Sequence, residues 1–144
     1  MQKLLVSACL AGEKTNYKGE SNYCSKIEQL KEQYELVIFC PEVEGGLPIP
    51  RIPSEIKGSQ VINKEGQNVT RNYELGANKA LGLCKYLGIT KALLKEKSPS
   101  CGTHLIHNGS FDDRLIAGMG VTARVLKDHG IEVYSEDEID KLLK

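Results

Sequence analysis

The chain has 144 residues, enough to bury the core of one domain, and we expect a single domain over residues 1–144. Its 19 basic and 19 acidic residues give a formal net charge of zero, so we expect no general affinity for nucleic acids. Neither a signal peptide nor an apolar run of roughly 18 residues is visible, so we expect a cytoplasmic protein without a membrane-spanning segment. In that compartment, the five cysteines are expected to be thiols rather than a disulfide framework.

The first third of the chain predicts two buried strands joined by a helix. In chain order, we expect a strand over 3–8, a polar loop over 13–24, a helix over 25–34, a strand over 36–40 and an irregular segment over 41–53. The helix prediction rests on apolar residues spaced three and four apart, which is the period of one helix face. The irregular segment, PEVEGGLPIPRIP, is rich in proline and glycine, which regular structure does not tolerate well.

The rest of the chain alternates helices and strands after one small hairpin. We expect a hairpin over 59–71 that turns at 64–66, a helix over 71–87, a strand over 90–95, a loop over 103–117, a helix over 121–129, a strand over 131–134 and a helix over 135–143. A strand, a helix and a second strand in this order form a right-handed crossover between parallel strands. The sequence therefore predicts an α/β fold, a three-layer Rossmann-like sandwich with a mostly parallel sheet and a small β-hairpin excursion.

Three cysteines each stand at the end of a predicted strand, where the chain turns. Cys9 ends the run LLVSAC, Cys40 ends LVIFC, and Cys101 lies in SPSCG after the third strand. The carboxyl ends of parallel strands meet at one edge of the sheet, and open α/β sheets bind their ligands at that edge. Three soft thiol ligands at one edge predict a metal or metal–sulfur centre with one coordination position left open.

The remaining cysteines and the histidines leave alternatives open. Cys84 lies in the middle of a predicted helix, where a small buried side chain is the simplest interpretation. Cys24 lies in a loop near a helix start, where a thiol is often more reactive. His104 follows Cys101 by three residues, so the strand-end cysteines and this histidine would also form a Cys3His zinc module without enzymatic activity. The sequence assigns no role to His107.

Four motifs, SACLAG, CPEVEGGLPIPR, EKSPSCG and GMGVTA, occur in an order and at intervals that resemble the bacterial thiouracil desulfidase family. The resemblance extends over nearly the whole chain. It implies a Rossmann-like domain in which Cys9, Cys40 and Cys101 hold a [4Fe–4S] cluster whose fourth iron has no protein ligand. It also implies that Glu42 in CPE and Ser100 in PSC are the catalytic acidic residue and hydroxyl.

The activity that the resemblance implies is a non-redox, hydrolytic removal of sulfur from 2-thiouracil or a related small thiolated pyrimidine. A thiocarbonyl sulfur is a soft donor, which suits an open iron better than a carbonyl oxygen does. Glu42 is close in sequence to a cluster ligand and is expected to accept the proton of the attacking water as a general base. Ser100, next to Cys101, is expected to relay a proton or to hold the intermediate. Sulfide and the oxo-pyrimidine are the expected products.

The sequence leaves several roles in the site open. Glu44 is a rival for the acid–base position, and Glu42 could instead form an ion pair with Arg51. Arg51 is the candidate for binding a substrate carbonyl or phosphate, although it could also lock the proline-rich loop. A thionucleotide or thiouridine substrate would require a basic phosphate clamp near Arg51 or Arg71. Residues 103–108 differ from the small residues and Tyr-Asp-Gly common in relatives, which leaves the pocket shape and the exact substrate open. The sequence also leaves the oligomeric state open.

Overall fold

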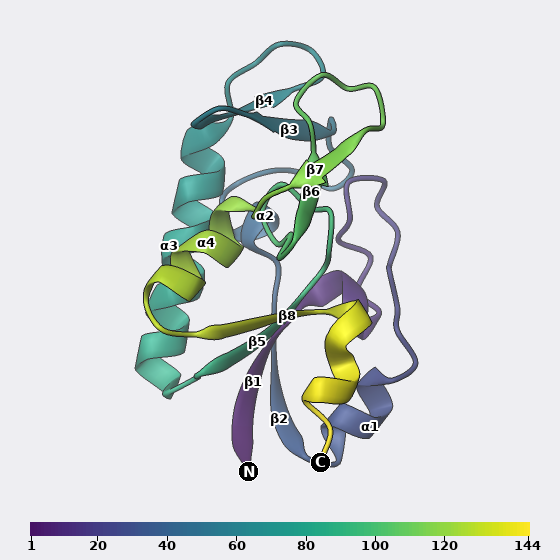
Figure 1. Cartoon of the computed structure of the whole chain (residues 1–144), viewed down its shortest axis with the longest axis vertical. Helices are drawn as coiled ribbons and strands as arrows, with labels where there is room; N and C mark the ends of the chain where they lie inside the picture. The colour runs from purple at the N-terminus through teal and green to yellow at the C-terminus, as the bar shows by residue number, and fades with distance from the viewer.

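Four parallel strands form the central sheet of the computed structural model, which describes residues 1–144 (Figure 1). They are β1 (Gln2–Ser7), β2 (Tyr34–Phe39), β5 (Lys91–Leu94) and β8 (Glu132–Ser135), in the order β2-β1-β5-β8. The chain first adds β2 on one side of β1 and then β5 on the other side. The sheet therefore has a switch point between β1 and β5, where an open α/β sheet forms a crevice at its carboxyl edge.

Helices cover both faces of this sheet and complete three layers (Figure 1). One face carries α3 (Thr70–Leu87) and α4 (Val121–Asp128), and the other carries α1 (Ile27–Lys31) and the 3-10 helix η2 (Glu136–Lys141). Because successive residues of a strand point to opposite faces, Leu5 of β1 packs with α3 and α4, whereas Leu4 and Val6 pack with α1 and η2. None of the helices combines the length and the apolar composition needed to span a membrane. The predicted three-layer α/β sandwich is confirmed.

Two antiparallel hairpins stand beyond the carboxyl edge of the sheet, where the sequence predicted one (Figure 1). They are β3 (Ser54–Lys57) with β4 (Gln60–Asn63), and β6 (Leu105–His107) with β7 (Leu115–Ala117). The first hairpin turns at Gly58, whose φ of +61° suits a tight turn. The predicted turn at 64–66 is also present, because the backbone N–H of Asn63 donates to the carbonyl oxygen of Gln67 across it, at 2.9 Å. Of the strand expected after that turn, only Asn68 forms a bridge, to Ile62, because α3 already begins at Thr70.

Two short helices follow the ends of β1 and β2. They are the 3-10 helix η1 (Ala8–Ala11) and α2 (Pro41–Glu44). The segment 41–53 was predicted to be irregular throughout, yet proline is compatible with the first turn of a helix because its missing N–H would have no intrahelical acceptor. As a result, the chain turns sharply after Cys40 and carries Glu42 on a helical turn at the edge of the sheet.

Helix α2 contacts α3 so closely that glycine is required on both sides. A Cβ atom on Gly76 of α3 would overlap the carbonyl oxygen of Pro41, and one on Gly45 would overlap the carbonyl oxygen of Asn72. Gly76 is an ordinary helical residue, so its role is to allow the close approach of two backbones rather than an unusual dihedral angle. This contact positions the start of α2, and with it Glu42.

Replacing Gly76 with alanine is expected to destabilise the fold by roughly 1–3 kcal/mol, because the methyl group overpacks a backbone contact that cannot rotate away. Gly82→Ala on the same helix is the matched control, since nothing lies within 4 Å of the added Cβ. There, alanine is expected to stabilise the protein by roughly 0.5–1 kcal/mol through its higher helix propensity. Urea unfolding measures whether each variant raises or lowers the free energy of unfolding. Equal changes in the two variants would contradict the role given to the close approach of the backbones.

Candidate active site

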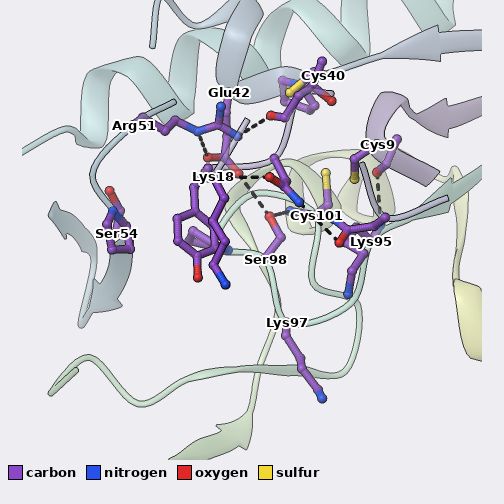
Figure 2. Close-up of a pocket in the computed structure, with 18 of the residues that line it drawn as sticks. Cys9, Lys18, Cys40, Glu42, Arg51, Ser54, Lys95, Lys97, Ser98 and Cys101 are labelled. Carbon is purple, nitrogen blue, oxygen red and sulfur yellow. Dashed lines mark hydrogen bonds and ion pairs between the residues drawn. The ribbon is translucent and has the colours of Figure 1, made fainter. Parts of the chain in front are cut away.

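A cavity of about 530 Å³ opens at the carboxyl edge of the sheet and is bounded by both hairpins (Figure 2). Cys9, Cys40 and Cys101 line this cavity and follow β1, β2 and β5, respectively. All three are free thiols, of which Cys101 is buried and the other two are partly buried. The structure therefore brings the three strand-end cysteines to one cavity, whereas Cys24 and Cys84 lie outside it.

The thiols in the cavity all have raised pKa values. Burial is the largest cause for each, and the charge of Cys40 adds to it for Cys9 and Cys101. Neighbouring buried thiolates are unfavourable unless a metal neutralises them, and metal binding then releases their protons. No three His, Cys, Asp or Glu side chains of the chain converge closely enough to hold a single metal ion. The three thiols therefore fit a soft, multi-atom metal–sulfur group better than one zinc ion.

The Cys3His zinc alternative is not assembled, because His104 lies outside the cavity. Its side chain is 59% exposed, and Nδ1 contacts the Thr103 hydroxyl at 2.8 Å and the Glu96 carboxylate at 3.1 Å. His107, for which the sequence indicated no role, does line the cavity. Its buried Nδ1 has no hydrogen-bond partner. Of these two histidines, only His107 contributes to the wall of the site.

The carboxylate of Glu42 lies in the cavity wall and is held by three donors (Figure 2). Oε2 accepts hydrogen bonds from Arg51 Nε at 2.8 Å and from the Tyr73 hydroxyl at 3.0 Å. Oε1 accepts one from the Ser98 hydroxyl at 3.3 Å. Because two carboxylate oxygens offer about four acceptor positions, one position on Oε1 remains for a water or a substrate. Glu44, the rival in the sequence, is exposed and does not line the cavity.

Of the two serines in SPSC, Ser98 lines the cavity, whereas the predicted Ser100 does not. Ser98 Oγ accepts the backbone N–H groups of Ser100 at 3.0 Å and Cys101 at 2.9 Å, so its own proton is left for Glu42. Ser100 is fully buried, and its hydroxyl pairs with that of Thr122 at 2.7 Å. A serine that begins a turn often accepts N–H groups two and three residues ahead. That pattern in SPSC is the sequence signal for Ser98.

Arg51 forms the ion pair with Glu42 that the sequence left open, and it holds the surrounding loops. Its guanidinium also donates to the carbonyl oxygens of Thr15 at 2.9 Å and Pro48 at 3.4 Å, and its side chain is 5% exposed. These contacts tie the proline-rich segment and the polar loop over 13–24 to the Glu42 carboxylate. Three of the five N–H groups of the guanidinium are used, so two remain for a ligand.

Exposed lysines line the rim of the cavity. Three of them, Lys18, Lys64 and Lys97, form no ion pair with a carboxylate. Lys95 also lines the cavity, but it pairs with a Glu136 carboxylate oxygen at 2.8 Å. Arg71, which the sequence offered as part of a phosphate clamp, does not line the cavity. A phosphate group would therefore meet the three rim lysines rather than Arg71.

The sequence matches one protein-family model over most of its length. That model, described as 2-thiouracil desulfurase, covers residues 4–138. The chain belongs to this family. The uncharacterized protein YbbK of Bacillus subtilis (strain 168) is 39% identical over 150 residues, which cover 97% of this chain and 99% of the relative. A solved structure of TudS, described as a [4Fe-4S]-dependent thiouracil desulfidase, is 45% identical, covers 99% of this chain and 95% of its own, and has a TM-score of 0.94.

In this member of the 2-thiouracil desulfurase family, Glu96 anchors the segment that follows Cys101. Its buried carboxylate accepts the backbone N–H groups of Thr103 at 2.8 Å, His104 at 3.0 Å and Leu105 at 3.1 Å. Burial by itself raises the pKa of Glu96, but hydrogen bonds from the backbone of His104 and Leu105 and from the side chains of Thr103 and His104 outweigh it and lower the pKa to about 2. The ionised carboxylate therefore stabilises the native state.

The stability that Glu96 contributes is expected to fall in acid. Because folding lowers its pKa from 4.5, the contribution is complete above about pH 4.5 and is lost as the pH falls toward 2. At neutral pH it amounts to roughly 3 kcal/mol. Glu96→Gln is expected to lower the free energy of unfolding at pH 7 and to flatten its decline between pH 4.5 and 2. Urea unfolding across this pH range tests both effects, and Glu74→Gln, at an exposed position, is the control. If the free energy of unfolding of E96Q declined with pH as steeply as that of the wild type, the role of Glu96 would be contradicted.

Proposed function

We propose that this protein is a [4Fe–4S]-dependent desulfidase that hydrolyses 2-thiouracil, or a related small thiolated pyrimidine, to the oxo form. The observation that carries the proposal is the common cavity of three free thiols and one oriented carboxylate. Family membership supports the substrate class, and 45% identity to a [4Fe-4S]-dependent thiouracil desulfidase supports the cofactor. The reaction balances without electron transfer, because water supplies the carbonyl oxygen and its two protons leave with the sulfur as hydrogen sulfide.

Cys9, Cys40 and Cys101 are the residues proposed to hold the cluster. All three are free thiols, and sulfur is a soft donor that iron–sulfur clusters require. The three also lie close enough to interact, because the charge of Cys40 raises the pKa values of Cys9 and Cys101. When bound through three cysteines, such a cluster supplies one open, Lewis-acidic iron that polarises a thiocarbonyl group. The cavity beside the thiols leaves room for a small ring next to that iron.

The proposed proton acceptor is Glu42, through the acceptor position that remains on Oε1. Arg51 and Tyr73 hold Oε2, so the carboxylate keeps its orientation toward the cavity. Ser98 already donates its proton to Glu42 and is proposed to return a proton to the leaving sulfur. In this proposal, Ser98 takes the role that the family motif suggested for Ser100, because Ser98 lines the cavity and Ser100 does not.

A thionucleotide is the second candidate substrate, and the rim lysines favour it. Lys18, Lys64 and Lys97 are exposed cations next to the cavity, and a phosphate is the chemical group that such lysines recognise. The free base, 2-thiouracil, has no phosphate for them. If the substrate is a thionucleotide, changing the three lysines to alanine weakens its apparent affinity and raises its KM, while turnover of the free base is unchanged at every concentration.

The function is tested on protein purified and reconstituted without oxygen. We expect a brown protein with iron and acid-labile sulfide in equal amounts, which releases sulfide and forms uracil from 2-thiouracil. In water labelled with oxygen-18, the new carbonyl oxygen carries the label, as hydrolysis requires. Parallel assays with thiouridine monophosphate decide between the two substrates. A colourless protein that binds one zinc ion, or a loaded protein that releases sulfide from neither substrate, would rule the proposal out.

A further inference from the structure

The carboxylate of Glu55 joins the two hairpins that stand beyond the carboxyl edge of the sheet (Figure 1). Glu55 lies on β3, and its Oε1 accepts the backbone N–H groups of Gly109 at 2.9 Å and Phe111 at 3.1 Å, in the loop between β6 and β7. Glycine allows this contact, because a Cβ atom on Gly109 would lie 2.6 Å from the carbonyl oxygen of Ile56. Two segments far apart in the sequence therefore fix the direction of this carboxylate.

The other oxygen of this carboxylate, Oε2, has no partner within the chain. Glu55 is 7% exposed, forms no ion pair and accepts hydrogen bonds only at Oε1. His107 Nδ1 is the one fully buried side-chain nitrogen or oxygen atom without a hydrogen-bond partner, so Oε2 remains accessible. A carboxylate largely removed from water is costly unless donors satisfy it, and Oε2 has two acceptor positions to fill.

Glu55 belongs to the wall of the candidate active site. Glu55, its partner Phe111 and the nearby His107 all line the cavity that also contains the three thiols and Glu42. Glu42 is held by three donors, one of which is the guanidinium of Arg51, whereas Glu55 has no cation beside it. Glu55 therefore offers a charged acceptor whose missing donor has to come from a ligand in the cavity.

We propose that Glu55 is a substrate-binding residue whose Oε2 accepts a hydrogen bond from a ring N–H of the thiolated pyrimidine. The inference rests on the proposed function and adds to it the group that selects the ring. In 2-thiouracil, an N–H stands on each side of the thiocarbonyl carbon. A carboxylate accepts from such an N–H and disfavours a ring nitrogen that carries a methyl group or a lone pair instead. The alternative is that Glu55 serves only to tie the two hairpins together.

The test compares 2-thiouracil with its 1-methyl and 3-methyl derivatives on the reconstituted wild-type protein and on Glu55→Gln. Glutamine keeps an oxygen for Gly109 and Phe111 but has an NH2 group in place of Oε2. We expect KM for 2-thiouracil to rise by roughly 10–100-fold in the variant, as for loss of a hydrogen bond to a charged group, with the iron content unchanged. Methylation of the contacted nitrogen is expected to weaken binding to the wild type by a similar factor and to change binding to Glu55→Gln much less. Glu65→Gln, at an exposed position outside the cavity, is the control with wild-type behaviour.

Calorimetric titration with uracil, which has the same ring N–H groups, gives a second measurement that does not depend on turnover. We expect a similar rise in the Kd of uracil in Glu55→Gln and none in Glu65→Gln.

A purely structural role predicts a different result. In that case, Glu55→Gln loses stability but keeps the wild-type preference among 2-thiouracil and its two methyl derivatives, and this outcome would overturn the inference. If Glu55→Gln does not fold, Glu55→Asp, which keeps the charge but draws the carboxylate back, is expected to show a smaller loss of that preference. The full wild-type preference in Glu55→Asp would then count against the inference. A cluster-loaded wild type that releases sulfide from neither 2-thiouracil nor thiouridine monophosphate would instead refute the proposed function, so the two failures are distinguishable.

Discussion

Cys101→Ala is expected to abolish binding of the iron–sulfur cluster and to reduce sulfide release from 2-thiouracil to the rate without enzyme. Two thiolates then remain, and the side chain of Cys101 is buried, so a solvent ligand cannot easily replace it. The nearest histidine in the sequence, His104, is held by Glu96 outside the cavity. Iron and sulfide analysis, together with the visible absorbance of the reconstituted protein, measures the loss.

Cys84→Ala is the matched control for this experiment. Cys84 is as buried as Cys101, and burial raises its pKa to about 11, but it packs among α3, α4 and the sheet and does not line the cavity. We expect this variant to lose about 1 kcal/mol of stability, as small core truncations do, and to keep its iron and its activity. Full iron content in Cys101→Ala, or loss of iron in Cys84→Ala, would contradict the proposed ligand set.

Glu42→Gln is expected to lower kcat for sulfide release by roughly 10²–10⁴-fold while the cluster content stays the same. Glutamine has nearly the same shape, and its amide oxygen can still accept from Arg51, so the loop should keep its structure. It cannot accept the proton of the attacking water, which is the role that the remaining position on Oε1 suggests for Glu42. The measurement is kcat per cluster, with the iron content of each sample determined in parallel.

Glu44→Gln distinguishes the two acids of the CPEVE motif. Glu44 is exposed and lies outside the cavity, and its backbone carbonyl oxygen, rather than its carboxylate, accepts a hydrogen bond from Lys79. We expect kcat to change less than twofold in this variant. A large loss in Glu44→Gln together with near-normal turnover in Glu42→Gln would reverse the assignment of the base.

Part of the candidate site was predictable because it is built from strand ends. In a parallel sheet, the residues that follow the strands meet at one edge whatever their separation in sequence, so Cys9, Cys40 and Cys101 were expected to share a cavity. The choice between Ser98 and Ser100 was not predictable from adjacency to Cys101. It depends on which hydroxyl lies on the cavity side of a tight turn. The Ser100 hydroxyl instead lies in the interior, where it forms a hydrogen bond with the Thr122 hydroxyl.

Local patterns by themselves determined the alternation of strands and helices, the three layers and the strand-end positions of Cys9, Cys40 and Cys101, because hydrophobic period and turn residues act over a few neighbours. Only the tertiary structure decided the pairing of β3 with β4, the close contact at Gly76, and the three donors that converge on Glu42. Each of these depends on segments far apart in the chain. Their approach follows from the packing of the whole core, which no short stretch of sequence contains.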